Sequence, residues 1–436
     1  MVMRSRDPKE QAMGLKVFAT DTPGIGGTLK LDPQHFRVDE VSRYPVPHPN
    51  GRVTILRVEA LEIEQNELFR RLTAALSLPP GVIGFAGTKD RRALTTQLVS
   101  IPGGPLRLDD LHLSGVRILE SYRAEEGLFL GHLYGNYFDI RVSGVGTNPE
   151  ATSDLVRSTA RSLEALGGFP NFFGPQRFGE IRPVTHLVGR ALVLHSVTEA
   201  VETYLTAEAE GETGDGKDAR RAYREHHDAE RALREFPHHL RFERVLLDRL
   251  ARGDPPERAF RALPRHLKSL FVHAYQSFLF NEYLSLRIQE GLPLGQPIAG
   301  DILIRRGVDG LPGALPPVVV SSDNLREATT LVANGRAAVA APLVGLESAD
   351  LHDLPAELLN RVLEAEGVTK SDFHLEDVPK LSSSGDARVL EARLSHGFFQ
   401  QPMEWATEGM PRFRFCLDKG TYATTLMREF MKATAN

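Results

Sequence analysis

The sequence predicts a mixed α/β (α+β) fold, with a mixed-sheet core that is discontinuous in sequence and a large, mostly helical insert. Three observations support this prediction. The chain has 436 residues, which is too long for one ordinary hydrophobic core. Segments with strand-like alternation occur near both ends, and the region between them is mostly helical in pattern and rich in Arg, Glu and Ala. We therefore expect a core at 28–165 and 372–436, an insertion domain at 166–371 and a flexible lead-in at 1–27.

The first part of the chain has the periodicity of strands and of two helices. The segments with strand character are 53–59, 97–101 and 138–142. Asn66 is the expected N-cap of a helix that stops at Pro79-Pro80. Residues 155–166 are amphipathic, and Gly167-Gly168 provides a C-terminal stop for that helix.

Helices and short strands are also expected in the insert and in the C-terminal segment. A long apolar-faced helix, or a pair of helices, is expected at 267–288, followed by short strand-like pieces at 301–305 and 317–320. The charged stretch at 206–220 is either disordered or clamps RNA, and composition does not separate these options. Near the C-terminus, 412–417 alternates as a strand and 422–431 has a helical pattern.

Composition limits the class of protein. The chain is 41% hydrophobic and 25% charged, which is typical of a soluble globular protein. It has no run of about 18 apolar residues and no secretory signal, so we expect no membrane association. The single cysteine, Cys416, excludes an intramolecular disulfide and fits a reducing cytoplasm. The net charge of −5 argues mildly against nucleic-acid binding, but a locally basic surface remains open because arginines concentrate at 220–265.

The segment AGTKDRRALTTQ at 86–97 carries the strongest chemical signal. Its glycine permits a turn that presents Asp90 on a connection between two strands. Lys89, Arg91 and Arg92 surround that carboxylate with positive charge, which favours its ionised form. An ionised aspartate acts as a general base or as a nucleophile, and the arginines suit a phosphate-bearing partner. The alternative is a surface turn with solvated charges.

Further segments accompany this motif along the chain: 29–40, which ends in FRVDE, then GNYF at 135–138, PNFFGPQRFG at 170–179, HAYQSFLFN at 273–281 and KGTYATTLMRE at 419–429. Together with 86–97, these segments resemble the TruD-type pseudouridine synthases from about residue 28 to the C-terminus. The chain length and the residues Ala-Tyr-Gln-Ser at 274–277 resemble those of archaeal and eukaryotic members. The resemblance implies a pseudouridine synthase domain that is interrupted by a family-specific insertion domain, with RNA held between the two.

The resemblance also implies a reaction. It identifies the chain as an RNA isomerase that converts uridine to pseudouridine in tRNA, at uridine 13 of the D-arm, after flipping the target base. Such a reaction requires no redox step, metal or external cofactor. Asp90 corresponds to the essential aspartate of the family. Whether Asp90 attacks carbon or acts as a base stays open.

The same resemblance assigns substrate-binding positions. These positions are Lys30, Phe36, Asn136, Phe138 and Tyr422. His35 replaces the acidic residue that usually precedes the phenylalanine, and tyrosine replaces the usual bacterial phenylalanine at 422. From the residues alone, Lys30 fits a surface lysine, the two phenylalanines fit core packing and Asn136 fits a turn.

Basic residues in the motifs are candidate RNA contacts. They are Lys89, Arg91, Arg92, Arg177 and Arg428. Arg428 pairs equally well with a nearby acid, and Arg177 belongs to a segment that also fits a hinge between domains.

Other function classes receive less support. A non-catalytic RNA-binding or tRNA-folding protein remains the alternative, although an intact Asp90 among substrate-binding residues argues against it. The Gly24–Gly27 turn lacks the Lys-Ser/Thr and the helix of a nucleotide-binding loop. The His226-His227 and His238-His239 pairs lack a spacing that would gather metal ligands, so no metal is expected. The sequence does not indicate an oligomeric state.

Overall fold

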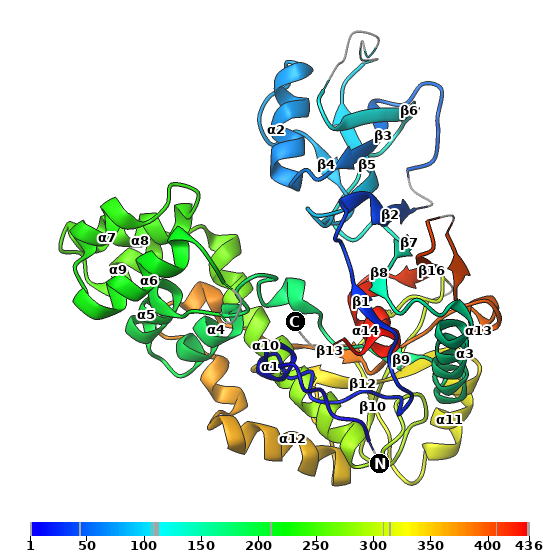
Figure 1. Ribbon diagram of the computed structural model, residues 1–436. Helices are drawn as coiled ribbons and strands as arrows, with labels where there is room; N and C mark the ends of the chain where they lie inside the picture. Colours follow the sequence, from blue (N-terminus) through cyan, green and yellow to red (C-terminus); the bar gives the residue numbers. More distant parts are fainter. Residues whose placement is uncertain are drawn as a thin grey trace. The chain divides into compact units, whose positions relative to one another are not determined.

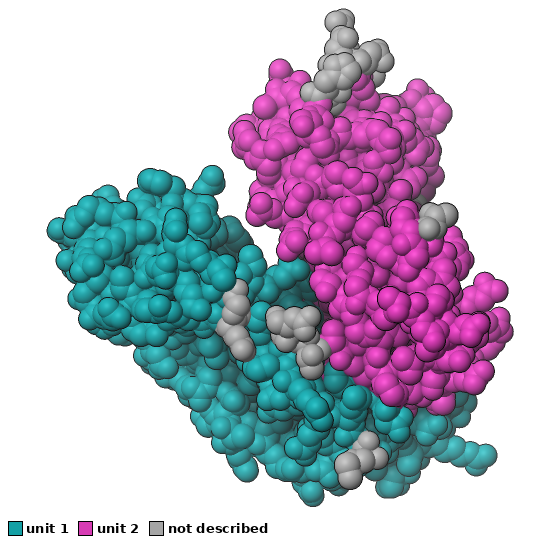
Figure 2. Space-filling view, in the orientation of Figure 1, with its two compact units in different colours: residues 1–21, 170–391, 434–436 teal, residues 22–169, 392–433 magenta. Residues whose placement is uncertain are grey.

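Strands and helices occur in both of the compact units into which the chain divides (Figures 1 and 2). The computed structural model describes residues 2–42, 45–104, 106, 108, 113–209, 212–307, 309–313, 315–406 and 408–433. Unit 1 comprises 1–21, 170–391 and 434–436, and unit 2 comprises 22–169 and 392–433. The mixed α/β class predicted from the sequence is confirmed. The functional domain boundaries at 28, 166 and 372 stay predictions.

Unit 2 is built on an eight-stranded mixed sheet in the order β15-β16-β7-β2-β5-β3-β6, with β4 paired to β5. Within it only β2 and β5 run parallel. A separate two-stranded sheet pairs β1 with β8. The strands of this unit are β1 (Gly26–Thr28), β2 (Phe36–Val41), β3 (Val53–Leu61), β4 (Gly84–Phe85), β5 (Leu94–Pro102), β6 (Val116–Ala124), β7 (Gly135–Arg141), β8 (Ser143–Val145), β15 (Glu404–Trp405) and β16 (Pro411–Asp418).

Two hydrophobic clusters join helices to the large sheet. One contains Leu163 and Phe430 together with the strand residues Phe138 and Phe413, and the other packs Leu68 with its neighbours against β3 and β5. The helices of unit 2 are η1 (Pro33–His35), α2 (Gln65–Ala75), α3 (Pro149–Leu166), α13 (His396–Gln400) and α14 (Ala423–Met431).

The predicted helix start at Asn66 is wrong. The N-cap of α2 is Glu64, whose carboxylate accepts the backbone N–H of Glu67 at 3.1 Å. The Asn66 side chain instead donates to Glu64. The carboxylate of a glutamate is able to reach this N–H, so the helix begins two residues earlier than the residue preference for asparagine indicates.

Unit 1 is mostly helical and contains a four-stranded antiparallel sheet in the order β11-β10-β12-β13. The long helix expected at 267–288 is confirmed as α10 (Arg265–Gln289), which packs on α4. Figure 1 shows α5 to α9 gathered in green, apart from the sheet of the same unit. The other elements are α1 (Pro8–Ala12), η2 (Pro175–Arg177), α4 (Thr185–Val193), α5 (Val197–Thr206), α6 (Asp215–His226), α7 (Ala229–Glu235), α8 (Arg241–Ala251), α9 (Pro256–Arg261), β10 (Ile302–Arg305), β11 (Val318–Val319), α11 (Leu325–Ala333), β12 (Ala337–Leu343), α12 (Asp353–Glu366), η3 (Lys370–Phe373), η4 (Pro379–Leu381) and β13 (Asp386–Val389). The chain passes between units within β9 (Phe169–Pro170) and at β14 (Glu391–Ala392).

The N-terminal segment, for which the sequence indicates a flexible lead-in, is tied into unit 1 up to residue 21. The Asn281 amide donates to the Met13 carbonyl at 2.9 Å, and the Ser285 hydroxyl donates to the Gly14 carbonyl at 2.6 Å. Gly14 has a φ of +78°, and a Cβ there would lie 2.9 Å from the Cβ of Asn281. The segment follows α10 closely because glycine permits this approach.

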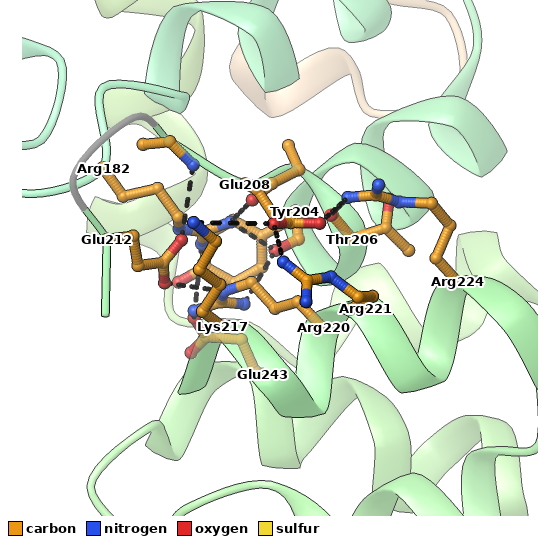
Figure 3. Close-up of polar contacts among 12 residues, drawn as sticks. Arg182, Tyr204, Thr206, Glu208, Glu212, Lys217, Arg220, Arg221, Arg224 and Glu243 are labelled. Carbon is orange, nitrogen blue, oxygen red and sulfur yellow. Dashed lines mark hydrogen bonds and ion pairs between the residues drawn. The ribbon is translucent and has the colours of Figure 1, made fainter. Parts of the chain in front are cut away.

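The charged stretch within 206–220 contributes to a buried ion-pair network (Figure 3). The side chain of Arg220 is 2% exposed and donates to Glu212 at 3.2 Å and to Glu243 at 2.8 Å. Arg182 shares Glu243 and also donates to the Tyr204 carbonyl. Residues 210 and 211 lie outside the described part of the chain. Composition alone indicates a solvated stretch because it does not reveal that carboxylates from α8 and from the loop converge on one arginine.

We expect Glu243→Gln to lower the free energy of unfolding by about 3–5 kcal/mol, because two buried guanidinium groups would then share a single carboxylate. Urea unfolding measures this loss. Glu235→Gln is the matched control, since Glu235 pairs with Arg231 on an exposed helix face and its loss should lower the free energy of unfolding far less. Equal and small losses in the two variants would show that the network adds no stability.

Buried His186 makes unit 1 sensitive to acid. Burial lowers the pKa of His186 from 6.5 to about 4, opposed by a backbone hydrogen bond with Ala12. The ring stacks on Phe278 at 5.1 Å and meets the edge of Phe178 at 5.2 Å. The folded pKa lies below the unfolded one, so the unfolded chain binds the proton first as the pH falls. The contribution of neutral, buried His186 to the free energy of unfolding is therefore complete above about pH 6.5. It falls by about 3 kcal/mol as the pH drops to 4.

We expect His186→Phe to remove this dependence, because phenylalanine fills the aromatic site without a titrating group. The measurement is the change in melting temperature between pH 7 and pH 4.5, which should be smaller in the variant than in the wild type. His239→Phe, at an exposed position, should leave the wild-type pH dependence unchanged. An identical pH dependence in wild type and His186→Phe would contradict the assignment.

Candidate active site

Asp90 lies on the connection between β4 and β5, as the sequence predicts. The loop is fixed at two points: the Gly131 N–H donates to the Ala86 carbonyl at 2.7 Å, and the Lys89 N–H donates to the Gln65 side chain at 3.0 Å. Asp90 itself keeps a side-chain exposure of 25%. The loop therefore presents a partly open carboxylate from a supported backbone.

Lys30 is the cation that faces this carboxylate. Its ammonium nitrogen lies 3.5 Å from Oδ2 of Asp90 and 4.6 Å from the centre of the Phe36 ring, and its side chain is only 6% exposed. The backbone of Lys30 has a φ of +57°, which is uncommon for a residue other than glycine. Arg92 donates to the Lys30 carbonyl at 3.3 Å. The surface-lysine alternative is thus wrong, and the buried ammonium of Lys30 pairs with the carboxylate of Asp90.

Lys89 turns into the protein. Its ammonium lies 2.7 Å from Oε2 of Glu40, and the two side chains are 4% and 1% exposed. The expectation that Lys89 contacts RNA is therefore corrected, because its ammonium is enclosed and paired. Glu40 and Gln65 have no role that the sequence alone indicates. Glu40 belongs to the FRVDE segment and Gln65 to no motif, and both act through partners that are distant in sequence.

Asn136 lies in β7, directly opposite Glu40 on β2 and Leu417 on β16, and not in a turn. The preceding Gly135 is required, because a Cβ there would lie 1.9 Å from the Leu417 carbonyl oxygen. Oδ1 of Asn136 is buried and accepts no hydrogen bond from any described residue. A buried oxygen in this state is suited to a donor from a ligand.

The aromatic residues of the site differ in exposure. Phe36 and Phe138 are 1% and 6% exposed, and their rings meet edge to face at 6.3 Å between centroids. Phe138 also stacks on Phe415 at 5.5 Å. Both phenylalanines therefore belong to the hydrophobic core of unit 2, as the packing alternative predicts. Tyr422 is half-buried and is the N-cap residue of α14, four positions after the end of β16.

The remaining basic candidates occupy different environments. Arg91 and Arg92 are exposed beside Asp90, whereas Arg428 is 8% exposed within α14. Arg177 belongs to unit 1 and lies over the Phe173 ring at 5.1 Å. The Nε of Arg177 is buried without an acceptor among the described residues. The pKa of His273 is lowered by the burial of the imidazole and by the positive charge of Arg177.

Other chemistry receives no support from the described residues. They contain no group of three or more His, Cys, Asp and Glu side chains that would hold a metal ion. None of the helices in the described ranges is long and apolar enough to cross a membrane. Cys416 is exposed on the polar face of β16.

Comparison with known proteins agrees with this arrangement. The family model described as tRNA pseudouridine synthase D (TruD) matches residues 12–430. A probable tRNA pseudouridine synthase D from Methanosarcina mazei is 35% identical over 429 residues, which cover 97% of each chain. One from Pyrococcus furiosus is 37% identical over 427 residues, or 96% of this chain and 98% of that one. A crystal structure titled putative tRNA pseudouridine synthase D (TruD) from Methanosarcina mazei is similar with a TM-score of 0.82 and 34% identity, over 98% and 99% of the two chains.

Proposed function

This chain belongs to the TruD family of tRNA pseudouridine synthases, and we propose that it acts on uridine 13 of the D-arm with Asp90 as the essential carboxylate. It is an isomerase that converts uridine to pseudouridine in tRNA. The choice of uridine 13 rests on the resemblance of the motifs. The observation that carries the role of Asp90 is its contact with Lys30, a buried cation held in a strained backbone conformation.

The reaction detaches uracil by breaking the bond between C1′ and N1, turns the base, and forms a bond between C1′ and C5. The proton on C5 is lost and N1 gains one, so atoms balance without an oxidant, a reductant or a cofactor. Asp90 acts on the sugar, either as a nucleophile at C1′ or as a base. Both roles require an ionised carboxylate, and the ammonium of Lys30 lies 3.5 Å from Oδ2 of Asp90.

Asn136 recognises the uracil edge in this proposal. Its buried Oδ1, which accepts no hydrogen bond from the described residues, suits the N3–H of uracil. The amide nitrogen is able to donate to a neighbouring uracil carbonyl. An asparagine on a central strand reads the base from a rigid support, which supports this role over that of a turn residue.

The target base stacks against aromatic side chains after it leaves the RNA. Tyr422, which is half-buried, offers the accessible ring, and stacking contributes about 1–3 kcal/mol per base. Phe36 lies below the ammonium of Lys30 and packs on Phe138, so these two rings form the apolar wall next to the Lys30–Asp90 pair. An apolar wall strengthens the electrostatic interaction between the two charges by excluding water.

RNA phosphates are the proposed partners of four arginines. Arg91 and Arg92 are exposed on the loop that carries Asp90. Arg177 is a half-buried guanidinium whose Nε meets no acceptor among the described residues. Arg428 contributes less in this proposal, because it is 8% exposed. These contacts position the RNA and do not read its sequence.

The first test is site-resolved mapping of pseudouridine by carbodiimide labelling and primer extension on unmodified tRNA, without added metal or nucleotide. We expect a new stop that reports modification at uridine 13 with the wild type and none with Asp90→Asn or Asp90→Ala. The asparagine variant keeps the size of the side chain and removes its charge, and it should still bind tRNA.

Each other outcome of this experiment has one meaning. No stop with the wild type despite tRNA binding would support the non-catalytic RNA-binding alternative. A stop with the wild type at another uridine would refute the assignment to position 13 alone. A stop with the wild type and also with the Asp90 variants would mean that Asp90 is not essential.

A second test concerns Lys30. We expect Lys30→Met to lower the single-turnover rate by at least about 100-fold, because an electrostatic partner of the reacting carboxylate is lost. The dissociation constant for tRNA should change by less than about threefold. Lys30→Arg keeps the charge and should be intermediate. A loss of tRNA binding with an unchanged rate at saturation would make Lys30 a phosphate contact instead.

A further inference from the structure

The pair formed by Glu40 and Lys89 is enclosed and has no part in the chemistry described above. Its charged atoms lie 2.7 Å apart, with side-chain exposures of 1% and 4%. Removing two charges from water is costly, and apolar residues of similar volume often stabilise a protein as well or better. A buried ion pair directly beside a reacting group therefore calls for a reason other than stability.

The geometry supplies such a reason, because Lys89 immediately precedes Asp90. The side chain of Lys89 is directed inward to Glu40, whereas the side chain of Asp90 keeps 25% of its surface exposed. The backbone of Lys89 is held as well, since its N–H donates at 3.0 Å to Gln65, the first residue of α2. Lys89 is thus fixed through its side chain by the central sheet and through its backbone by a helix.

The immediate neighbours of Lys89 and Asp90 are less restrained, although Arg92 donates to the Lys30 carbonyl at 3.3 Å. Thr88 and Arg91, on either side of the Lys89-Asp90 dipeptide, are exposed. The side chains of both make no hydrogen bond or ion pair with another described residue. The orientation of Asp90 therefore depends on its neighbour at 89 and on the contact with Lys30.

We infer that Glu40 and Lys89 are positioning residues, which hold Asp90 in the orientation that the reaction needs. This inference rests on the proposed role of Asp90. Glu40 occupies β2 between β7 and β5, so its position is fixed by strands on both sides. The pair has no net charge, which leaves the Lys30 ammonium as the cation nearest in the described site to the carboxylate at 3.5 Å. A directional contact specifies one orientation of the loop, whereas an apolar contact would permit several.

The test compares single-turnover rates, tRNA dissociation constants and melting temperatures of three variants. Glu40→Gln breaks the ion pair, and we expect a rate loss of about 30- to 100-fold with the dissociation constant within about threefold, since a misplacement near 1 Å has such an effect. Glu40→Leu combined with Lys89→Met replaces the pair by apolar side chains. This double variant should melt at or above the temperature of Glu40→Gln and remain as slow.

Asp139→Asn is the matched control. Asp139 lies on β7, three residues from Asn136, and accepts two hydrogen bonds from Arg412 in another partly buried pair of the same sheet. The Asp139→Asn variant should have a lower melting temperature than the wild type and a single-turnover rate within about threefold of it.

Recovery of the wild-type rate by the double variant would overturn the inference, because the pair would then serve stability alone. The inference would also be overturned if Glu40→Gln changed only the tRNA dissociation constant, or if this variant reacted at the wild-type rate. An equal rate loss in Asp139→Asn would show a general effect of damage to the sheet. An inactive wild type would mean instead that the proposed function has failed.

Discussion

The parallel pairing of β2 with β5 is the constraint on which the site depends. In a parallel pair the segments that precede both strands lie at the same edge of the sheet. The register matches Arg37 with Leu94, so the chain before β2 meets the chain before β5. Lys30 belongs to the first of these segments and Asp90 to the second, although 60 positions separate them in the sequence. The antiparallel pairing of β2 with β7 then adds Asn136 opposite Glu40.

Charge is distributed unequally within this arrangement. The Lys89–Glu40 pair is closed to solvent, whereas the Lys30–Asp90 pair has one partner at 6% and the other at 25% side-chain exposure. A fully enclosed pair is able to fix geometry but not to meet a substrate. A pair that is open on the side of its carboxylate can offer an ionised oxygen to an incoming sugar while its cation stays fixed. Under the proposed role of Asp90, support and reactivity are thus separated in two adjacent residues, Lys89 and Asp90.

Features that depend on local periodicity were predictable from the sequence, and features that depend on distant partners were not. The strands at 53–59 and 412–417 and the helix at 267–288 appear as β3, β16 and α10, because alternation and helical spacing reflect burial directly. The helix start at Asn66 and the surface reading of Lys30 failed. In each case the residue type suggests one environment, and a specific contact or a long-range packing arrangement overrides it. The motif at 86–97 identified Asp90, but Glu40 and Gln65 emerge only when the sheet brings the chain together.

The reaction imposes opposite demands on the enzyme and on its substrate. Uracil must turn between the two bond changes, so the base needs freedom within the site, while the proposed carboxylate, as a nucleophile or as a base, must keep one orientation toward the sugar. The proposed recognition of the base has a rigid support, because Asn136 lies on a central strand that is paired on both sides. Asp90 lies on a loop, which by itself would be too mobile for a reacting group. The contacts of Lys89 with Glu40 and Gln65, and of Lys30 with Asp90, give this loop the rigidity that a strand has from its hydrogen bonds.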